Sequence, residues 1–284
     1  MERYKHTGNR NTDTVIEGIL EIERRFTVDS SIREAQIREL AISLFRDEND
    51  PDQALALISE IKSGSGLFRN VNECIVLCRE LLGRYGDRLE LRTGAFNDKS
   101  KTVAVLNNGY MERAFESFCD LDRLERVYYS GFEELCESVS AESCDCAIVP
   151  IENSENGKLL RFYSLIDRYD LKINAVCDVS YVDESASTRY ALVSKNLSAF
   201  ADPDCFEFSI SLESDQSIND VLFAASLCHM RLVRIDSIEL PYKDKEFAFH
   251  VVFDLQGADL QLFMLYMTLS FPQYIPIGIF KKVK

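Results

Sequence analysis

The chain has 284 residues with 47 acidic and 32 basic side chains, which gives a formal net charge of −15. This charge repels nucleic-acid phosphates and anionic membrane surfaces, so the composition argues against nucleic-acid binding and against membrane association. No apolar run approaches the roughly 18 residues of a membrane span, and the first residues are too polar for a signal core. We therefore expect a cytoplasmic protein.

The cysteines and histidines argue against a metal centre. Nine cysteines are scattered through apolar segments, where we expect most of them to be reduced and buried. Cys144 and Cys146 are spaced too closely for the usual zinc half-site, and the three histidines lie far apart in sequence. We predict neither a metal nor another cofactor.

Residues 1–94 are predicted to form an all-helical domain behind a polar tail. Apolar residues recur every three to four positions between Thr14 and Tyr85, which is the period of amphipathic helices. Asp50 and Pro51 predict an N-cap and the first residue of a helix, because proline needs no hydrogen-bond donor there. The polar stretch from Gly94 to Lys101 is the predicted linker.

Residues 102–203 are predicted to form an α/β lobe. Strands that alternate with helices are typical of an α/β fold with a mostly parallel sheet. Apolar or alternating runs predict five strands here: 103–106, 127–129, 146–149, 173–181 and 190–193.

Residues 204–284 show the order β-α-β-β-α-β, which is the ferredoxin-like arrangement. Its predicted elements are 206–212, 217–229, 232–240, 247–255, 258–269 and 274–280. The predicted protein is thus multidomain and mixes α/β with α+β architecture: a helical domain, an α/β lobe and a ferredoxin-like domain.

The most informative stretch is Pro150–Gly157, which reads P-I-E-N-S-E-N-G. It follows the buried strand at 146–149 and precedes a helical segment. Proline removes a ladder donor, so we expect the strand to end there and to present polar side chains at its carboxyl end, where open α/β sheets bind ligands. The alternative is a polar turn between a strand and a helix.

Two motifs carry a family resemblance. The stretch at 150–157 is similar to the P-I-E-N-[ST]-x-x-G segment that lines the prephenate pocket of prephenate dehydratases. Ser187–Val193 resembles a second segment of that family, T-R-F leading into a strand, with tyrosine replacing phenylalanine. The resemblance covers about residues 102–284, and the domain order resembles bifunctional chorismate mutase–prephenate dehydratases of phenylalanine biosynthesis, which end in a phenylalanine-binding ACT domain.

The resemblance implies roles for individual residues. It makes Thr188 the catalytic acid, and its implied substrate-binding residues are Glu152, Asn153, Ser154, Gly157 and Arg189. It assigns the ACT effector site to Asn219, Asp220, Asp236 and Ser237. Asn219 and Asp220 stand where the family has small residues and would crowd or repel an amino-acid carboxylate.

The chain departs from the family in one spacing. Only 30 residues separate Gly157 from Thr188, where the family has an entire second lobe. We therefore expect half of the pocket wall to be missing. Such a site could neither exclude water nor surround a dianionic substrate, and preorganisation supplies most of the catalytic power of such sites.

The helical domain occupies the position of a chorismate mutase. That class of enzyme grips a dianion with arginines and a lysine, and the candidates are Arg24, Arg25, Arg33, Arg38, Arg69, Arg79 and Lys62. The alternative is that these are solvated charges on helix faces.

The favoured hypothesis is a lobe-deleted pseudoenzyme that binds a small molecule, either prephenate-like or an amino acid, and acts in regulation or oligomerisation. The alternatives are an active chorismate mutase or prephenate dehydratase, and an ACT-type sensor of another metabolite. ACT domains commonly pair side by side and strand edges need protection, so we also expect a homodimer.

Overall fold

The computed structural model describes residues 28–43, 50–65, 70–89, 94–95, 101–119, 124–180, 186–200, 202–214, 216–239 and 247–283. Contacts divide the chain into two compact units, Met1–Leu89 and Glu90–Lys284. The further division at residue 204 stays a prediction. Within the described ranges, no helix is both long and apolar enough to cross a membrane.

The described part of the first unit is helical, as predicted. Its elements are a helix over 28–43, α2 (Pro51–Ser65), α3 (Val71–Tyr85) and the short 3-10 helix η1 (Gly86–Arg88). The predicted start of α2 is confirmed, because the backbone amide of Asp52 donates a 3.0 Å hydrogen bond to Asp50 Oδ1. The predicted apolar positions from Val15 to Phe26 lie outside the described residues.

The second unit is built on one large sheet in the order β10-β11-β9-β12-β6-β7-β4-β2-β3, with β5 paired to β4. Its strands are β2 (Lys101–Leu106), β3 (Leu124–Tyr129), β4 (Cys146–Asn153), β5 (Gly157–Lys158), β6 (Lys172–Ser180), β7 (Ser187–Ser194), β9 (Cys205–Ser211), β10 (Arg231–Glu239), β11 (Phe247–Asp254) and β12 (Ile275–Val283). Its helices are α4 (Gly109–Cys119), α5 (Phe132–Ser140), α6 (Leu160–Arg168), α7 (Ile218–Leu227) and α8 (Leu260–Ser270). The short strands β1 (Gly94–Ala95) and β8 (Ser198–Ala199) form a separate two-stranded parallel sheet. Strand β1 lies within the predicted linker, and β8 follows β7.

The prediction of a mostly parallel sheet over 102–203 is wrong, because this part of the sheet is mixed. Strand β2 pairs in parallel with β3 and β4, but β7 runs antiparallel to both β4 and β6. The local apolar pattern of a buried strand is the same in either direction, so it could not distinguish the two. The crossover through α4 runs from β2 to β3 and the one through α5 runs back from β3 past β2 to β4, so right-handed connections place α4 and α5 on opposite faces of the sheet.

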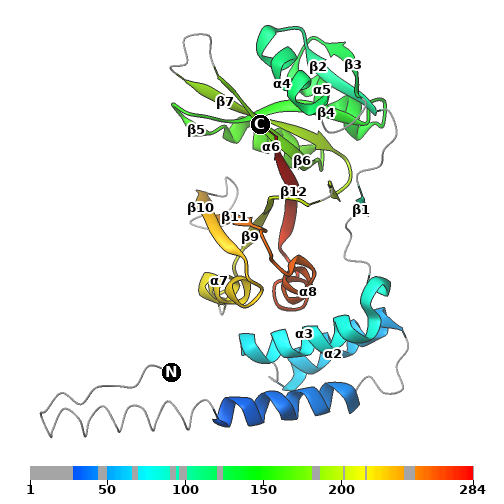
Figure 1. The fold of residues 1–284 in the computed structure, drawn as a ribbon, viewed down its shortest axis with the longest axis vertical. Helices are drawn as coiled ribbons and strands as arrows, with labels where there is room; N and C mark the ends of the chain where they lie inside the picture. The colour runs from blue at the N-terminus through cyan, green and yellow to red at the C-terminus, as the bar shows by residue number, and fades with distance from the viewer. Residues whose placement is uncertain are drawn as a thin grey trace, which may run out of the picture. The chain divides into compact units, whose positions relative to one another are not determined.

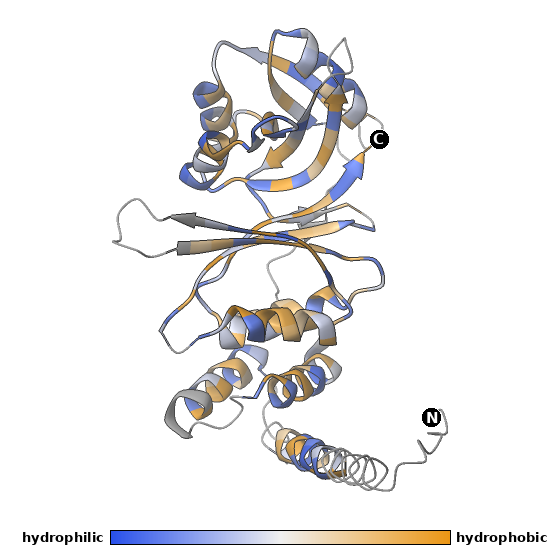
Figure 2. Cartoon of the chain, turned by 90° about the vertical axis from the view of Figure 1, so that its left-hand side faces the viewer, coloured by the Kyte–Doolittle hydropathy of each residue, from blue (hydrophilic) through white to orange (hydrophobic). Residues whose placement is uncertain are grey.

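The C-terminal strands and helices follow the predicted order β-α-β-β-α-β. Strands β10, β11, β9 and β12 are antiparallel neighbours, and Figure 1 shows α7 and α8 on one side of them. Their core is aromatic: Phe206, Phe208, Phe253 and Phe263 are fully buried and pack with ring centroids 5.3–6.3 Å apart. Figure 2 shows hydrophobic residues along these strands and the helices packed on them. Burying each phenylalanine contributes about 2–3 kcal/mol.

Strand β12 joins the C-terminal strands to the rest of the sheet by pairing in parallel with β6. The approach is close, because a Cβ atom at Gly278 would lie 2.5 Å from the carbonyl oxygen of Ile173. A glycine is therefore required where the two strands meet. The polar residues described next lie on both sides of this junction.

Candidate functional site

The P-I-E-N-S-E-N-G stretch forms a hairpin and not the predicted strand-to-helix turn. Strand β4 runs through Pro150 to Asn153, and β5 then folds back so that Glu152 pairs with Lys158 and Asn153 with Gly157. The turn is closed by Asn153 Oδ1, which accepts a 2.6 Å hydrogen bond from the backbone amide of Asn156. Gly157 has φ +69°, a left-handed conformation that favours glycine.

Pro150 does not end the strand, which corrects the sequence-based expectation. Its neighbour on one side is Tyr190 of β7, and the register shifts between Pro150 and Glu152. On the other side, β2 pairs with β4 only at Cys146 and Ala147. The missing N–H of Pro150 therefore breaks no ladder bond, and a bulge accommodates the ring.

The structure brings the two sequence motifs together as direct neighbours in the sheet. Asn153 lies opposite Thr188, and Glu152 lies opposite Arg189. The Ser154 backbone amide donates to Ser187 O at 2.9 Å, and Ser154 Oγ accepts from the Ser187 amide at 3.0 Å. Thr188 is only 7 % exposed. The predicted site residues thus meet as neighbours on paired strands.

The predicted ligand-binding charges pair with one another. Arg189 forms a two-pronged contact with Asp178 of β6, with Nε–Oδ1 and Nη2–Oδ2 both at 2.9 Å, and its Nη1 contacts Glu152 Oε2 at 3.2 Å. These three residues face each other across β6, β7 and β4. The hydrogen bonds to Asp178 and the charges of both carboxylates raise the pKa of Arg189.

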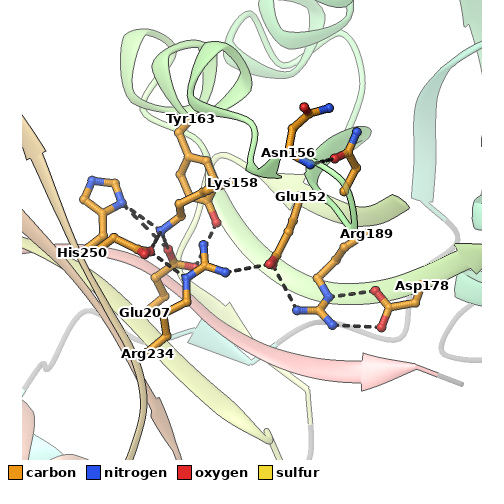
Figure 3. Close-up of polar contacts among 11 residues, drawn as sticks. Glu152, Asn156, Lys158, Tyr163, Asp178, Arg189, Glu207, Arg234 and His250 are labelled. Atoms are coloured by element: carbon orange, nitrogen blue, oxygen red, sulfur yellow. Dashed lines mark hydrogen bonds and ion pairs between the residues drawn. The ribbon is translucent and has the colours of Figure 1, made fainter. Parts of the chain in front are cut away.

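Glu152 is also held from the C-terminal strands. Arg234 of β10 donates from Nη1 to Glu152 Oε1 at 2.7 Å and from Nε to Asp236 Oδ2 at 2.7 Å. Figure 3 shows Glu152 between the guanidinium groups of Arg189 and Arg234. Burial opposes ionisation of Asp236, but the hydrogen bond from Arg234 and the charge of Lys158 lower its pKa.

A buried lysine, which the sequence analysis did not identify, lies at the end of the hairpin. The Lys158 side chain is 8 % exposed and its Nζ lies 2.7 Å from Oε1 of Glu207, which is 3 % exposed. The ammonium also lies 3.2 Å from His250 Nδ1 and 4.3 Å from the centroid of the Tyr163 ring. Tyr163 OH donates to Glu207 Oε2 at 3.3 Å. The sequence offered one sign of this ion pair, the single glutamate between Phe206 and Phe208 in an aromatic run.

This cluster holds His250 neutral. Burial, and then the charge of Lys158, lower the pKa of His250 from 6.5 to about 4. Its Nδ1 can therefore accept from the lysine, which assigns the ring proton to Nε2. Burial and the Glu207 carboxylate raise the pKa of Tyr163 well above its usual value, so its hydroxyl stays a donor. Each of these groups thus has a complementary charged or hydrogen-bonding neighbour.

The predicted effector residues lie on two elements, α7 and β10. Asn219 and Asp220 lie in the first turn of α7, where the Asn219 amide donates to Ser217 Oγ at 3.2 Å. Asp236 pairs across the strand with His250 and contacts Lys158, whereas Ser237, the next residue, points to the opposite face of the sheet. Their role in effector binding stays a prediction.

Two of the arginines proposed for a mutase pocket pair within the helical unit. Arg33 contacts Glu73, and Arg38 Nε lies 2.9 Å from Glu80 Oε1, so both connect helix 28–43 to α3. Arg79 is exposed. Arg24, Arg25, Arg69 and the side chain of Lys62 lie outside the described positions.

The neutral His250 predicts a pH dependence that a variant can isolate. Because its folded-state pKa is lowered, the unfolded chain takes up the proton first, and stability falls as the pH drops from 6.5 towards about 4. The full effect is about 3 kcal/mol. Asparagine at position 250 keeps an acceptor for Lys158 but does not titrate. The unfolding free energy of His250→Asn should therefore lack the part of the fall that His250 causes between pH 6.5 and about 4. Denaturant unfolding over this pH range measures the difference, and equal slopes for both proteins would refute the assignment.

Comparisons with known proteins find similarity to prephenate dehydratases over part of the chain. The family model described as Prephenate dehydratase matches residues 107–181, which include Glu152, Asn153, Ser154 and Gly157 but not Thr188. No curated protein matches the chain. The prephenate dehydratase of Streptococcus mutans has a similar structure, with a TM-score of 0.53 and 16 % identity over 64 % of this chain and 99 % of that chain. At this identity the likeness concerns the fold.

Two further solved structures have lower TM-scores. A protein described as a novel type of quorum-quenching acylase has a TM-score of 0.48 and 16 % identity, over 65 % of this chain and 96 % of that chain. The prephenate dehydratase of Arthrobacter aurescens in complex with L-Phe has a TM-score of 0.48 and 16 % identity, over 63 % of this chain and 90 % of that chain. By fold and by the match at 107–181, the second unit is prephenate dehydratase-like.

Proposed function

We propose that this chain is a prephenate dehydratase-like protein that does not dehydrate prephenate. It acts instead as a dimeric regulatory module, related to phenylalanine biosynthesis, that binds a small molecule such as an amino acid. The observation that carries the proposal is the pairing of Glu152 with Arg189 and Arg234, because these contacts occupy the charges that a dianionic substrate would need.

The arrangement of β4 and β7 supports the absence of dehydration. A catalytic hydroxyl must reach the substrate, but Thr188 is 7 % exposed and lies directly opposite Asn153 in the sheet. Between Gly157 and Thr188 the described residues contain only α6 and β6, with residues 181–185 outside the description. The shortness of this interval supports the proposal that a second lobe over the substrate is missing.

The activity assay uses prephenate and detects phenylpyruvate, with the Streptococcus mutans dehydratase as the positive control. We expect no more phenylpyruvate than in a protein-free reaction, and no change in Thr188→Ala. Chorismate incubated in parallel should yield no prephenate. Phenylpyruvate formation that Thr188→Ala abolishes would overturn the proposal in favour of an active enzyme.

A thermal-shift panel of amino acids tests ligand binding, since a ligand at 100 times its Kd stabilises by about 2.7 kcal/mol. A panel without any shift would refute the binding role.

The dimer is proposed to form through β10. This strand lies at one end of the sheet and exposes Leu232, Val233 and Ile235, beside the exposed Phe223 of α7. An edge strand with apolar side chains favours pairing with another strand, and a second copy offers the same edge.

Sedimentation velocity tests the dimer. We expect the wild type to be dimeric and Val233→Lys to be monomeric, because a charge on an edge strand opposes pairing. Val127→Lys on β3, at the opposite end of the sheet, is the matched control and should stay dimeric. A monomeric wild type, or a Val233→Lys dimer, would contradict this interface.

A further inference from the structure

The linker between the two compact units carries a short strand of its own. Strand β1 lies in this linker and pairs in parallel with β8, with Gly94 opposite Ser198 and Ala95 opposite Ala199. A sheet of two strands with two residues each is at best marginally stable by itself. The pairing therefore depends on the contacts that hold β8 in place.

A buried asparagine of the large sheet holds β8. Asn174 of β6 is fully buried, and its Nδ2 donates to Ser198 O at 2.8 Å and to Asn196 O at 3.4 Å. The buried hydroxyls of Ser194 and Ser198 also donate to Asn196 O, at 3.0 and 3.2 Å. The carboxamide of Asn174 thus connects β6 to the strand on which the linker docks.

The same carboxamide carries a group that costs stability. Among the residues that the structure describes, Asn174 Oδ1 is buried without a hydrogen-bond partner. An unpaired buried oxygen destabilises a fold, whereas an apolar side chain of the same shape avoids this cost. The contribution of an asparagine at this position is therefore its pair of donor contacts to residues 196 and 198.

We propose that Asn174 is a latch that fastens the linker to the second unit through β8. When β1 is docked, the tether between the units is the stretch from Leu89 to Gly94; when β1 is released, the tether extends to Lys101, where β2 begins. A longer tether has a longer reach and is more open to proteases. Docking and release of β1 form a conformational switch that sets the freedom of the helical unit.

The first experiment tests whether the linker docks. The full-length protein is digested briefly with trypsin, and mass spectrometry follows cleavage after Arg92 and Lys99, on either side of β1. Ala95→Pro removes a backbone donor and disfavours a paired strand, so we expect cleavage at these sites to be several-fold faster than in the wild type. An equal rate in both proteins would overturn the docking of the linker.

The second experiment tests the latch. Asn174→Leu removes the donor and the unpaired oxygen together, so linker cleavage should again be several-fold faster, while the denaturant concentration at half-unfolding should not fall. Ser194→Ala is the matched control, because Asn196 O keeps two donors, and its linker should be cleaved at the wild-type rate. The latch would be overturned by wild-type cleavage of Asn174→Leu, by faster cleavage that comes with a loss of global stability, or by equally fast cleavage of Ser194→Ala.

Discussion

The antiparallel pairing of β4 with β7 is the constraint on which the rest of the second unit depends. It places Glu152 opposite Arg189 and Asn153 opposite Thr188, so the two motifs meet within one sheet. The side chains therefore satisfy each other, and opposite charges facing each other across strands stabilise the sheet by about 0.2–1 kcal/mol per pair.

The hairpin that follows β4 connects this pairing to the C-terminal strands β9, β10 and β11. Arg234 reaches Glu152 from β10, and Lys158 reaches Glu207 and His250 on β9 and β11. Buried charges are expensive unless they are paired and hydrogen-bonded, which explains why Tyr163 and His250 complete the surroundings of the lysine and glutamate. The motif that suggested a ligand pocket thus has a structural use, and its chemistry is shared between both halves of the sheet.

Local signals predicted what is locally determined. Asp50 and Pro51 start α2 as expected, and the alternation of Phe206 and Phe208 with polar residues predicted a strand of the βαββαβ order. Pairing partners are not local. The sequence could not show that β2 stops pairing with β4 after Ala147, which is why Pro150 is tolerated. It also could not show that β12 pairs with β6, which brings Glu207 to Lys158. Glu152 and Arg189 were both predicted as substrate-binding residues, which stays a prediction, and the motifs gave no sign of Arg234, which lies 45 positions beyond Arg189 and contacts Glu152.

A double-mutant cycle on Lys158 and Glu207 tests most directly whether the hairpin is a structural tie. Lys158→Met, Glu207→Met and the double variant are unfolded in denaturant beside the same cycle on Lys195 and Glu142, an exposed pair. The account predicts a coupling of about 1–3 kcal/mol for the buried pair and less than about 0.5 kcal/mol for the exposed one. A buried-pair coupling near zero would contradict it.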